Sequence, residues 1–333
     1  MKPYLLSAAV ALLSTTASSN AQSPLDQPWP INPKGLTTAP ASTPGKVSPK
    51  KDANDQAIAD ANMVIEFNPK DVSSYLLRGA AYSRKGDFDK AYADFAKALE
   101  LEPNNAAAYN NRGLALARQR KTGEALVEFG KAIALNPNDP VTYYNRGVAY
   151  SSLGRDDDAI ADYTKAIGLN PNDAESFFNR GVVYRTRGEE ESAIADFTKT
   201  LEINPDDPDA YYNRGLSYLA RARYEEAIKD FTGALQLNPK IAVAYYNRGL
   251  ARSKSGQTDA AITDYSRAIQ LNPKDADAYY NRANARRLKG ERKTAIADYE
   301  AFIRNAPAKG YESYVQQAKK RIAELKSPDS SAH

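Results

Sequence analysis

Apolar residues recur through most of the chain at steps of three and four positions, the spacing of one face of an α-helix. Between residues 140 and 171 two such faces follow one another, the first with Tyr143, Gly147 and Tyr150 and the second with Ala159, Tyr163 and Ala166. Gly154 lies between them at the predicted turn, and Pro171 follows the second face, where it would end a helix. The pattern predicts a helical hairpin in which Gly147, without a Cβ, lets the second helix approach closely.

The same hairpin pattern returns every 34 residues, seven times in succession. The aromatic residue that marks each first helix is Tyr75, Tyr109, Tyr143, Phe177, Tyr211, Tyr245 or Tyr279. The alanine of each second helix is Ala91, Ala125, Ala159, Ala193, Ala227, Ala261 or Ala295, and the proline after it is Pro103, Pro137, Pro171, Pro205, Pro239, Pro273 or Pro307. Two helices alone cannot bury both faces, so we expect each hairpin to stack on the next.

A period of 34 residues with aromatic-x3-Gly-x2-Tyr, then Ala-x3-aromatic, then Pro resembles the tetratricopeptide repeat family. The resemblance covers Val72 to Lys309 as the units 72–105, 106–139, 140–173, 174–207, 208–241, 242–275 and 276–309. It implies an all-α fold, a right-handed α-solenoid of seven helix hairpins with an N-terminal half-repeat and a C-terminal capping helix. The half-repeat is 52–71, where Ala57, Ala61 and Val64 have the register of a second helix; the cap is 310–326, and a tail covers 327–333.

Several positions depart from the family pattern. Arg120 and Ala222 replace the turn glycine, while Leu116, Arg252 and Arg286 replace the second tyrosine. Where the family usually has leucine before the glycine, this chain has Arg78, Arg112, Arg146, Arg180, Arg214, Arg248 and Arg282. An acid follows sixteen residues after each arginine, at Asp94, Glu128, Asp162, Asp196, Asp230, Asp264 and Asp298. We predict an Arg–carboxylate pair that braces the two helices of each unit; the alternative is a row of ligand-binding arginines.

The first 51 residues lie outside the repeats. Lys2, the apolar run from Tyr4 to Leu13 and the small residues up to Ala21 predict a signal peptide over 1–21, cut after Ala21. The run is shorter than the roughly 20 apolar residues that span a bilayer; the alternatives are an uncleaved anchor and a buried helix. Residues 22–51 are rich in Pro and Ser and predict a mobile leader, in which Trp29 either docks on the repeat array or on a partner, or is solvated. We therefore expect export to the periplasm, or secretion.

The resemblance also implies where a partner binds. In this family the first helices line a concave groove, and ligand-facing residues lie at the second, fifth, ninth, twelfth and thirteenth repeat positions. The predicted partner-binding residues here are Tyr144, Phe178, Tyr212, Tyr246, Tyr280, Asn145, Asn179, Asn213, Asn247 and Asn281. An aromatic column suits a peptide, and the asparagines suit its backbone, although intrinsic stabilisation also explains them. Lysine at the fifth position with asparagine at the ninth, the clamp of chaperone-binding members, is missing, and Asn284 is the one match.

Composition argues against catalysis. There is no cysteine, and the only histidine is the last residue, His333. The sequence contains no phosphate-binding loop, dinucleotide turn, zinc motif or calcium loop. We predict a protein that is not an enzyme and needs no cofactor or metal. A net charge of +4 is too weak to imply a nucleic-acid partner.

These observations predict a protein–protein interaction scaffold or adaptor that binds one or more partner polypeptides in the concave groove. The resemblance to periplasmic repeat proteins suggests a role in cell-envelope assembly. The alternative is a glycan- or peptidoglycan-binding module that uses the same aromatic column.

Overall fold

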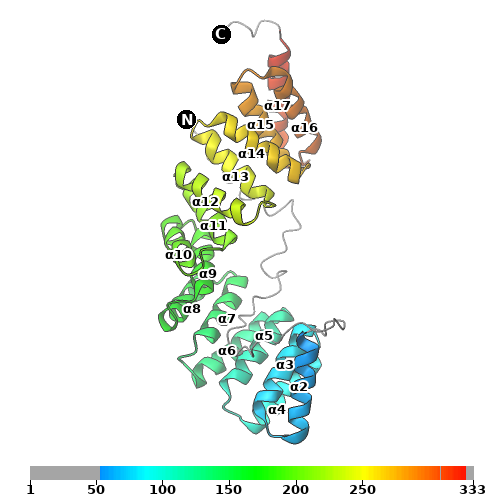
Figure 1. Ribbon diagram of the computed structural model, residues 1–333, viewed down its shortest axis with the longest axis vertical. Helices are drawn as coiled ribbons and strands as arrows, with labels where there is room; N and C mark the ends of the chain where they lie inside the picture. Colours follow the sequence, from blue (N-terminus) through cyan, green and yellow to red (C-terminus); the bar gives the residue numbers. More distant parts are fainter. Residues whose placement is uncertain (1–52, 308, 328–333) are drawn as a thin grey trace, which may run out of the picture. The chain divides into compact units, whose positions relative to one another are not determined.

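The computed structural model describes residues 53–307 and 309–327 (Figure 1). The predicted signal peptide, the leader with Trp29 and all but the first residue of the tail lie outside the described residues. The chain divides into two compact units, an N-terminal unit that ends at Asn179 and a C-terminal unit that begins at Arg180.

All regular secondary structure in the described residues is helical. The N-terminal unit holds α2 (Ala53–Phe67), α3 (Val72–Lys85), α4 (Phe88–Leu101), α5 (Ala106–Arg118), α6 (Thr122–Leu135), α7 (Pro140–Ser152) and α8 (Asp156–Leu169). The boundary falls within α9 (Ala174–Thr186). The C-terminal unit continues with α10 (Glu190–Ile203), α11 (Pro208–Ala220), α12 (Tyr224–Leu237), α13 (Ala242–Lys254), α14 (Thr258–Leu271), α15 (Ala276–Leu288), α16 (Arg292–Asn305) and α17 (Glu312–Lys326). The predicted all-α repeat fold is confirmed.

The ends of the helices follow from short local signals. Asp139 caps α7, its carboxylate accepting from the backbone N–H groups of Val141 and Thr142, and Pro140 opens the helix at a position where no N–H is needed. The turn inside a hairpin needs a left-handed residue, and Gly154 supplies it with a φ of 68°. Arg120 and Ala222, which replace that glycine, keep the same conformation with φ of 61° and 56°. Both therefore hold a backbone geometry that is costly for a residue with a Cβ.

The close approach predicted at Gly147 is present. A Cβ built on Gly147 would lie 2.9 Å from Cε1 of Tyr163, and one on Gly249 would lie 2.9 Å from Cε1 of Tyr265. The rings of Tyr163 and Tyr265 are each only 1% exposed. In six of the seven hairpins the core therefore contains a second-helix ring laid on a first-helix glycine, and the last repeat has Ala283 at that position. No helix in the described part of the chain has both the length and the hydropathy to cross a membrane.

All seven predicted Arg–carboxylate braces are present, so the prediction of bracing pairs is confirmed. Arg146 is typical: its Nε and Nη2 donate to the two oxygens of Asp162 at 2.7 and 2.8 Å. The others are Arg78–Asp94, Arg112–Glu128, Arg180–Asp196, Arg214–Asp230, Arg248–Asp264 and Arg282–Asp298. The carboxylates are buried and the guanidiniums at most a quarter exposed.

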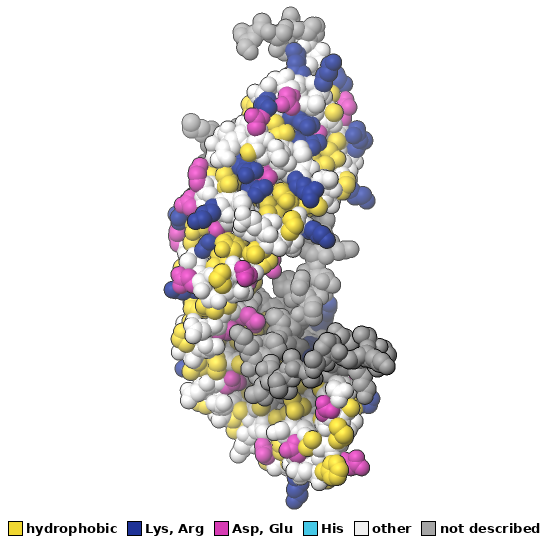
Figure 2. All heavy atoms as spheres, viewed as in Figure 1, with side chains coloured by type: hydrophobic (Ala, Val, Ile, Leu, Met, Phe, Trp, Pro, Cys, Tyr) yellow, Lys and Arg dark blue, Asp and Glu magenta, His cyan; other side chains and the backbone are white. Residues whose placement is uncertain are grey.

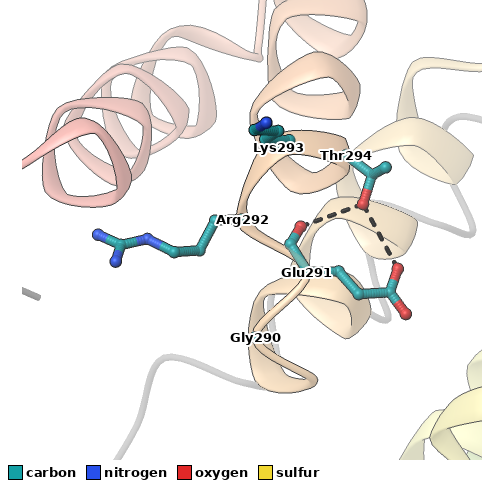
Figure 3. Close-up of a pocket in the computed structure, with 5 residues that line it drawn as sticks. All are labelled: Gly290, Glu291, Arg292, Lys293 and Thr294. Carbon is teal, nitrogen blue, oxygen red and sulfur yellow. Dashed lines mark hydrogen bonds between the residues drawn. The ribbon is translucent and has the colours of Figure 1, made fainter. Parts of the chain in front are cut away.

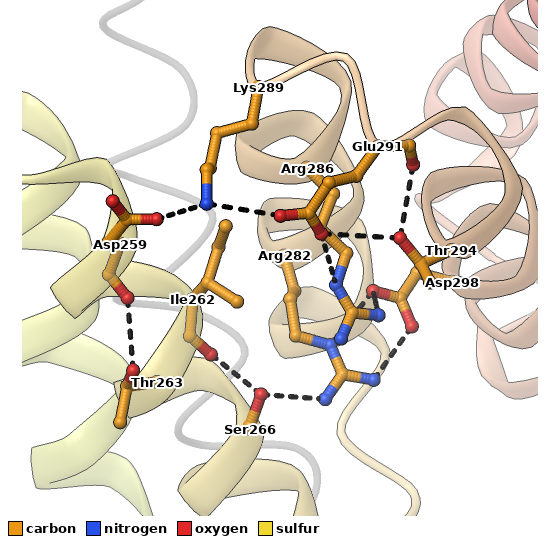
Figure 4. Close-up of polar contacts among 10 residues, drawn as sticks. All are labelled: Asp259, Ile262, Thr263, Ser266, Arg282, Arg286, Lys289, Glu291, Thr294 and Asp298. Atoms are coloured by element: carbon orange, nitrogen blue, oxygen red, sulfur yellow. Dashed lines mark hydrogen bonds and ion pairs between the residues drawn. The ribbon is translucent and has the colours of Figure 1, made fainter.

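The braces also link one repeat to the next, which the sequence analysis did not foresee. In the C-terminal unit the free Nη1 donates to a hydroxyl on the preceding second helix: Arg214 to Thr198, Arg248 to Thr232 and Arg282 to Ser266, at 2.9 to 3.1 Å. Figure 4 shows Arg282 between Ser266 and Asp298. In the N-terminal unit Asn62 stands at the equivalent position and accepts from Nη1 of Arg78 at 2.6 Å, whereas Ala96 and Gly130 have no side-chain acceptor.

Arg252 and Arg286, which replace the second tyrosine, are also explained. Each donates from Nη1 to the carboxylate that its own repeat already uses, Arg252 to Asp264 and Arg286 to Asp298, both at 2.8 Å. In these two repeats one buried carboxylate therefore accepts from two guanidiniums, and Figure 4 shows the second case, Asp298 with Arg282 and Arg286. The arginines replace a ring by a second charged hydrogen bond.

Candidate functional site

The predicted partner-binding residues lie on the first helices, at the fifth and sixth positions of their repeats. Every one of them is buried or half-buried. Tyr144 is the most enclosed of the aromatic residues, with 5% of its surface exposed, and Asn145 and Asn247 are 4% and 5% exposed. The face therefore presents parts of rings and single polar atoms to a ligand.

Each tyrosine of the column packs against the ring of the second helix in its own repeat. The centroid of Tyr144 lies 6.1 Å from that of Tyr163, and the ring planes are tilted by 50°. The other pairs, Tyr212–Phe231, Tyr246–Tyr265 and Tyr280–Tyr299, have centroids 5.8 to 6.0 Å apart. Tilted and edge-on contacts of this kind are favourable for aromatic rings and fix their orientation.

The asparagines join neighbouring repeats. Asn179 donates from Nδ2 to the hydroxyl of Tyr144 at 3.2 Å, and in the N-terminal unit Asn145 donates to Asn110 at 3.0 Å. The C-terminal unit repeats the arrangement with Asn247 to Tyr212 at 3.1 Å and Asn281 to Tyr246 at 3.0 Å. Asn213 differs, because it donates to the backbone oxygen of Asp209 in its own helix. The structure thus brings most of the predicted residues together in pairs separated by one repeat.

These bonds determine what the asparagines can offer to a ligand. Asn179 and Asn281 each use Nδ2 twice, for a tyrosine hydroxyl and for the backbone oxygen four residues earlier. Within the described residues no hydrogen bond reaches their side-chain oxygens. An amide oxygen has two lone pairs. It is therefore the acceptor by which each asparagine can receive a backbone N–H of a bound peptide.

Burial keeps the tyrosine hydroxyls neutral. It raises the pKa of Tyr212 to about 12, with a smaller opposing effect from the positive charge of Arg185. The pKa values of Tyr144 and Tyr246 are raised for the same principal reason. The tyrosines of the column, already uncharged at physiological pH, therefore stay uncharged at higher pH as well.

The sequence analysis did not take up the twelfth repeat position, where the C-terminal unit carries Arg185 and Arg287. Their Nε atoms are buried and have no hydrogen-bond partner within the described residues. Both differ from the bracing arginines, each of which has its own carboxylate. The sequence pattern that distinguishes these two arginines is the change of residue type at the twelfth position, which holds Leu219 and Ser253 in the intervening repeats.

A shallow depression at the turn between α15 and α16 is the cavity drawn in Figure 3, lined by Gly290, Glu291, Arg292, Lys293 and Thr294. Thr294 Oγ1 donates to the backbone oxygen and to the carboxylate of Glu291, at 3.1 and 3.4 Å. None of these residues is a predicted site residue. On the face drawn in Figure 2, acidic and basic side chains lie among apolar ones. Across residues 53–307 and 309–327 no group of three or more His, Cys, Asp or Glu side chains is placed to hold a metal ion.

Comparison with protein families gives matches along most of the array. Models described as "Tetratricopeptide repeat" match residues 72–105, 140–173 and 208–241, and others of that description match 95–127 and 277–308. A model described as "TPR repeat" matches 121–154, 183–221 and 251–290. Comparison with curated proteins gives no match.

Solved structures similar to the chain include YrrB, described as "a TPR protein with an unusual peptide-binding site". The two share 26% identity over 58% of this chain and 97% of YrrB, with a TM-score of 0.53. The C-terminal part of a TPR repeat-containing protein from Cytophaga hutchinsonii has 19% identity over 74% of this chain and 99% of that one, with a TM-score of 0.62. A tetratricopeptide repeat protein from Parabacteroides merdae has 22% identity over 82% and 100%, with a TM-score of 0.50. These last two likenesses concern the fold alone.

Proposed function

Because the chain belongs to the tetratricopeptide repeat family, we propose that it binds partner polypeptides along the face formed by its first helices. Its repeats and its structural neighbours support a protein–protein interaction scaffold. The finer proposal is that the tyrosine column and the asparagine oxygens together receive an extended segment of the partner. The peptide-binding site named for YrrB is consistent with this proposal.

The observation that carries the proposal is the pairing of tyrosine with asparagine. Each tyrosine ring is held by a ring beneath it, and the hydroxyls of Tyr144, Tyr212 and Tyr246 are held by the asparagine of the next repeat. A side chain fixed in this way loses little conformational entropy when a ligand binds. The side-chain oxygens of Asn179 and Asn281 accept no hydrogen bond within the described residues, so each can receive a backbone N–H of a bound segment.

We also propose that the protein is exported and works in the periplasm, with a role in assembly of the cell envelope. The support is the pattern of Lys2, the apolar run to Leu13 and the small residues before Gln22. Sequencing the N-terminus of the protein recovered from the periplasm tests the proposal. A chain that begins at Gln22 agrees with it, and a retained Met1 contradicts it.

A capture experiment with purified full-length protein tests the binding face. Asn213→Ala is the informative variant, because Asn213 bonds only within its own helix and its loss leaves the bonds between repeats intact. Asn204→Ala, in an exposed turn, is the matched control. Polypeptides from envelope extract that bind the wild type and the control but not Asn213→Ala support the proposal. Equal capture by all three proteins refutes it.

The glycan alternative has a separate arm in the same experiment. One side of each tyrosine ring packs on the second helix, for example Tyr246 on Tyr265, which leaves less ring surface for a sugar to stack on. Retention of the wild type on purified peptidoglycan, lost in Asn213→Ala, would favour that alternative over the polypeptide.

A further inference from the structure

The last repeat differs from the other six on the face of the first helices. Its ninth position holds Asn284, where the others hold Ala80, Leu114, Val148, Val182, Leu216 and Leu250. Its twelfth position holds Arg287, and the helix that follows it, α17, contributes Gln317 and Arg321. In an array built from one repeated pattern, polar residues gathered at a single place need a local explanation.

The hydrogen bonds at this place leave amide donors available. The hydroxyl of Tyr280 donates to Oε1 of Gln317 at 3.1 Å, and the hydroxyl of Tyr299 donates to Oδ1 of Asn284 at 2.6 Å. Both amides thus accept through their oxygens. The NH₂ group of Asn284 also reaches the hydroxyl of Tyr280 and lowers its pKa, and since an NH₂ group has two N–H donors, one donor remains. The ring of Tyr280 is itself fixed by Phe302 and Tyr314, with centroids 4.9 and 5.6 Å away.

The same place carries positive charge without a matching carboxylate. The Nε of Arg287 is buried without a partner, and no described carboxylate forms an ion pair with this residue. Burial raises the pKa of Tyr280 and of Tyr299, and the charges of Arg287 and Arg321 oppose that rise in both tyrosines. The two guanidiniums therefore lie near the same pair of hydroxyls. Arg321 has a partner in Glu324, but that pair is nearly half exposed and is weak.

We propose that the last repeat binds a carboxylate of the partner polypeptide, held by Arg287 with Arg321 and the amide groups of Asn284 and Gln317. Guanidinium and amide N–H groups are the donors that suit a carboxylate. A carboxylate is attracted more strongly to an arginine without a counter-charge where both groups are partly shielded from water. The proposal rests on the proposed function, because it assigns one chemical group of the polypeptide that the face receives.

The source of the carboxylate is an acidic side chain. Arg185, at the same twelfth position three repeats earlier in the C-terminal unit, also has a buried Nε without a partner. A chain has one terminus, whereas two separate arginines can both be satisfied by a segment with several Asp or Glu residues. The acid of the last repeat on this face, Asp277, stands ten positions before Arg287, about 15 Å along the helix, so it does not neutralise that arginine.

Binding of defined peptides to the full-length protein, followed by calorimetry, tests the proposal. The probe is an acetylated, amidated octapeptide of alternating Leu and Glu, compared with the Leu–Gln octapeptide in amidated and in free-acid form. We expect the Glu peptide to bind at least about tenfold more tightly than either Gln peptide, as a charge-assisted hydrogen bond requires. Tighter binding of only the free-acid Gln peptide would assign the site to a chain terminus and overturn the proposal.

Three variants locate the effect. Arg287→Gln and Asn284→Leu, the second restoring the residue type of the other repeats, should each weaken binding of the Glu peptide, Arg287→Gln by about tenfold. Arg304→Gln removes the same charge from an exposed position on α16 and should have no effect. Equal affinity of wild type and Arg287→Gln for the Glu peptide overturns the proposal, as does the absence of binding by the wild type.

A measurement on the wild type guards against a variant that fails to fold. The Arg287 side-chain Nε–H signal in a nitrogen–proton NMR spectrum should shift on addition of the Glu peptide and stay in place with the Gln peptides. The outcomes also separate the two proposals. If both peptides bind equally and Asn213→Ala weakens both, the binding face stands and the carboxylate site falls. If only Arg287→Gln matters, the carboxylate site stands without the wider face.

Discussion

Replacement of Asp264 by Asn tests how much a single buried carboxylate contributes to stability when it is paired with two arginines. Asp264 is 2% exposed and accepts from Arg248 at 2.8 and 2.9 Å and from Arg252 at 2.8 Å. Asn keeps the size of the side chain and one acceptor oxygen but removes the charge. Both guanidiniums, only 13% and 21% exposed, then lie without a counter-charge.

Breaking a buried ion pair by removing one partner costs about 3–5 kcal/mol. The guanidiniums retain some contact with water, so we expect the lower end, a loss of about 3 kcal/mol in the free energy of unfolding. Glu202→Gln provides the control, because the Lys199–Glu202 pair is 56% and 55% exposed and its loss should cost no more than about 0.5 kcal/mol.

The assay must report on the affected repeat, because a repeat array need not unfold in one step. Native-state hydrogen exchange of the amides in α13 and α14 gives the local opening free energy, and urea unfolding followed by circular dichroism gives the total. A loss of about 3 kcal/mol corresponds to exchange faster by about a hundredfold. A loss below about 1 kcal/mol, close to that of the exposed control, would refute the assignment of the brace as a buried, stabilising pair.

Three further predictions concern stability. Burial raises the pKa of Asp275 to about 6, so the folded state holds a proton that the unfolded chain releases near pH 4, and stability is lost as the pH rises through 6. Asp275→Asn keeps the helix cap but has no group that titrates. In urea titrations its free energy of unfolding, relative to that of the wild type, should therefore rise by about 2–3 kcal/mol between pH 4 and pH 7, and a constant difference would contradict this account. Ala222→Gly should raise stability by about 1 kcal/mol, because Ala222 holds a φ of 56° that is costly for a residue with a Cβ. The melting temperature should rise, and a lower melting temperature would show that the turn carries no strain. Gly147→Ala should lower stability by about 1–3 kcal/mol in urea unfolding, since its Cβ would meet Tyr163 at 2.9 Å, and an unchanged midpoint would show that the ring moves freely.

The sequence predicts the hairpins and the braces well because both are contained within one repeat. The spacing of sixteen residues from Arg146 to Asp162 returns in every unit, and opposite charges at a fixed spacing across two packed helices leave few other arrangements. The same spacing does not reveal that Arg248 also reaches Thr232, since that bond depends on which second helix lies beside it. It likewise does not reveal that Arg252 would turn to Asp264 in the space where other repeats place a tyrosine.

For the candidate site, the sequence identifies the column but not its internal contacts. The asparagines are predicted as donors or acceptors for a ligand, and the structure commits their N–H groups to a neighbouring tyrosine, as with Asn281 and Tyr246. That pairing joins residues 35 positions apart, one more than the period, and becomes visible only when adjacent first helices are placed side by side. Binding by these residues stays a prediction. Arg287 escaped notice because a lone arginine near a helix end is ordinary until its environment shows that nothing neutralises it.

The hydroxyl that Arg214, Arg248 and Arg282 each reach on the preceding second helix has a consequence for how such a chain can change length. Thr198 and Thr232 occupy equivalent places, so excision of residues 208–241 would bring Arg248 opposite Thr198 with the same chemical fit at the new junction. The contact between neighbouring repeats is the same at both places, so a whole repeat can be gained or lost by recombination without further substitutions at that contact. The encoded protein can therefore change length by whole repeats while the hydrogen bond between the newly adjacent repeats is kept.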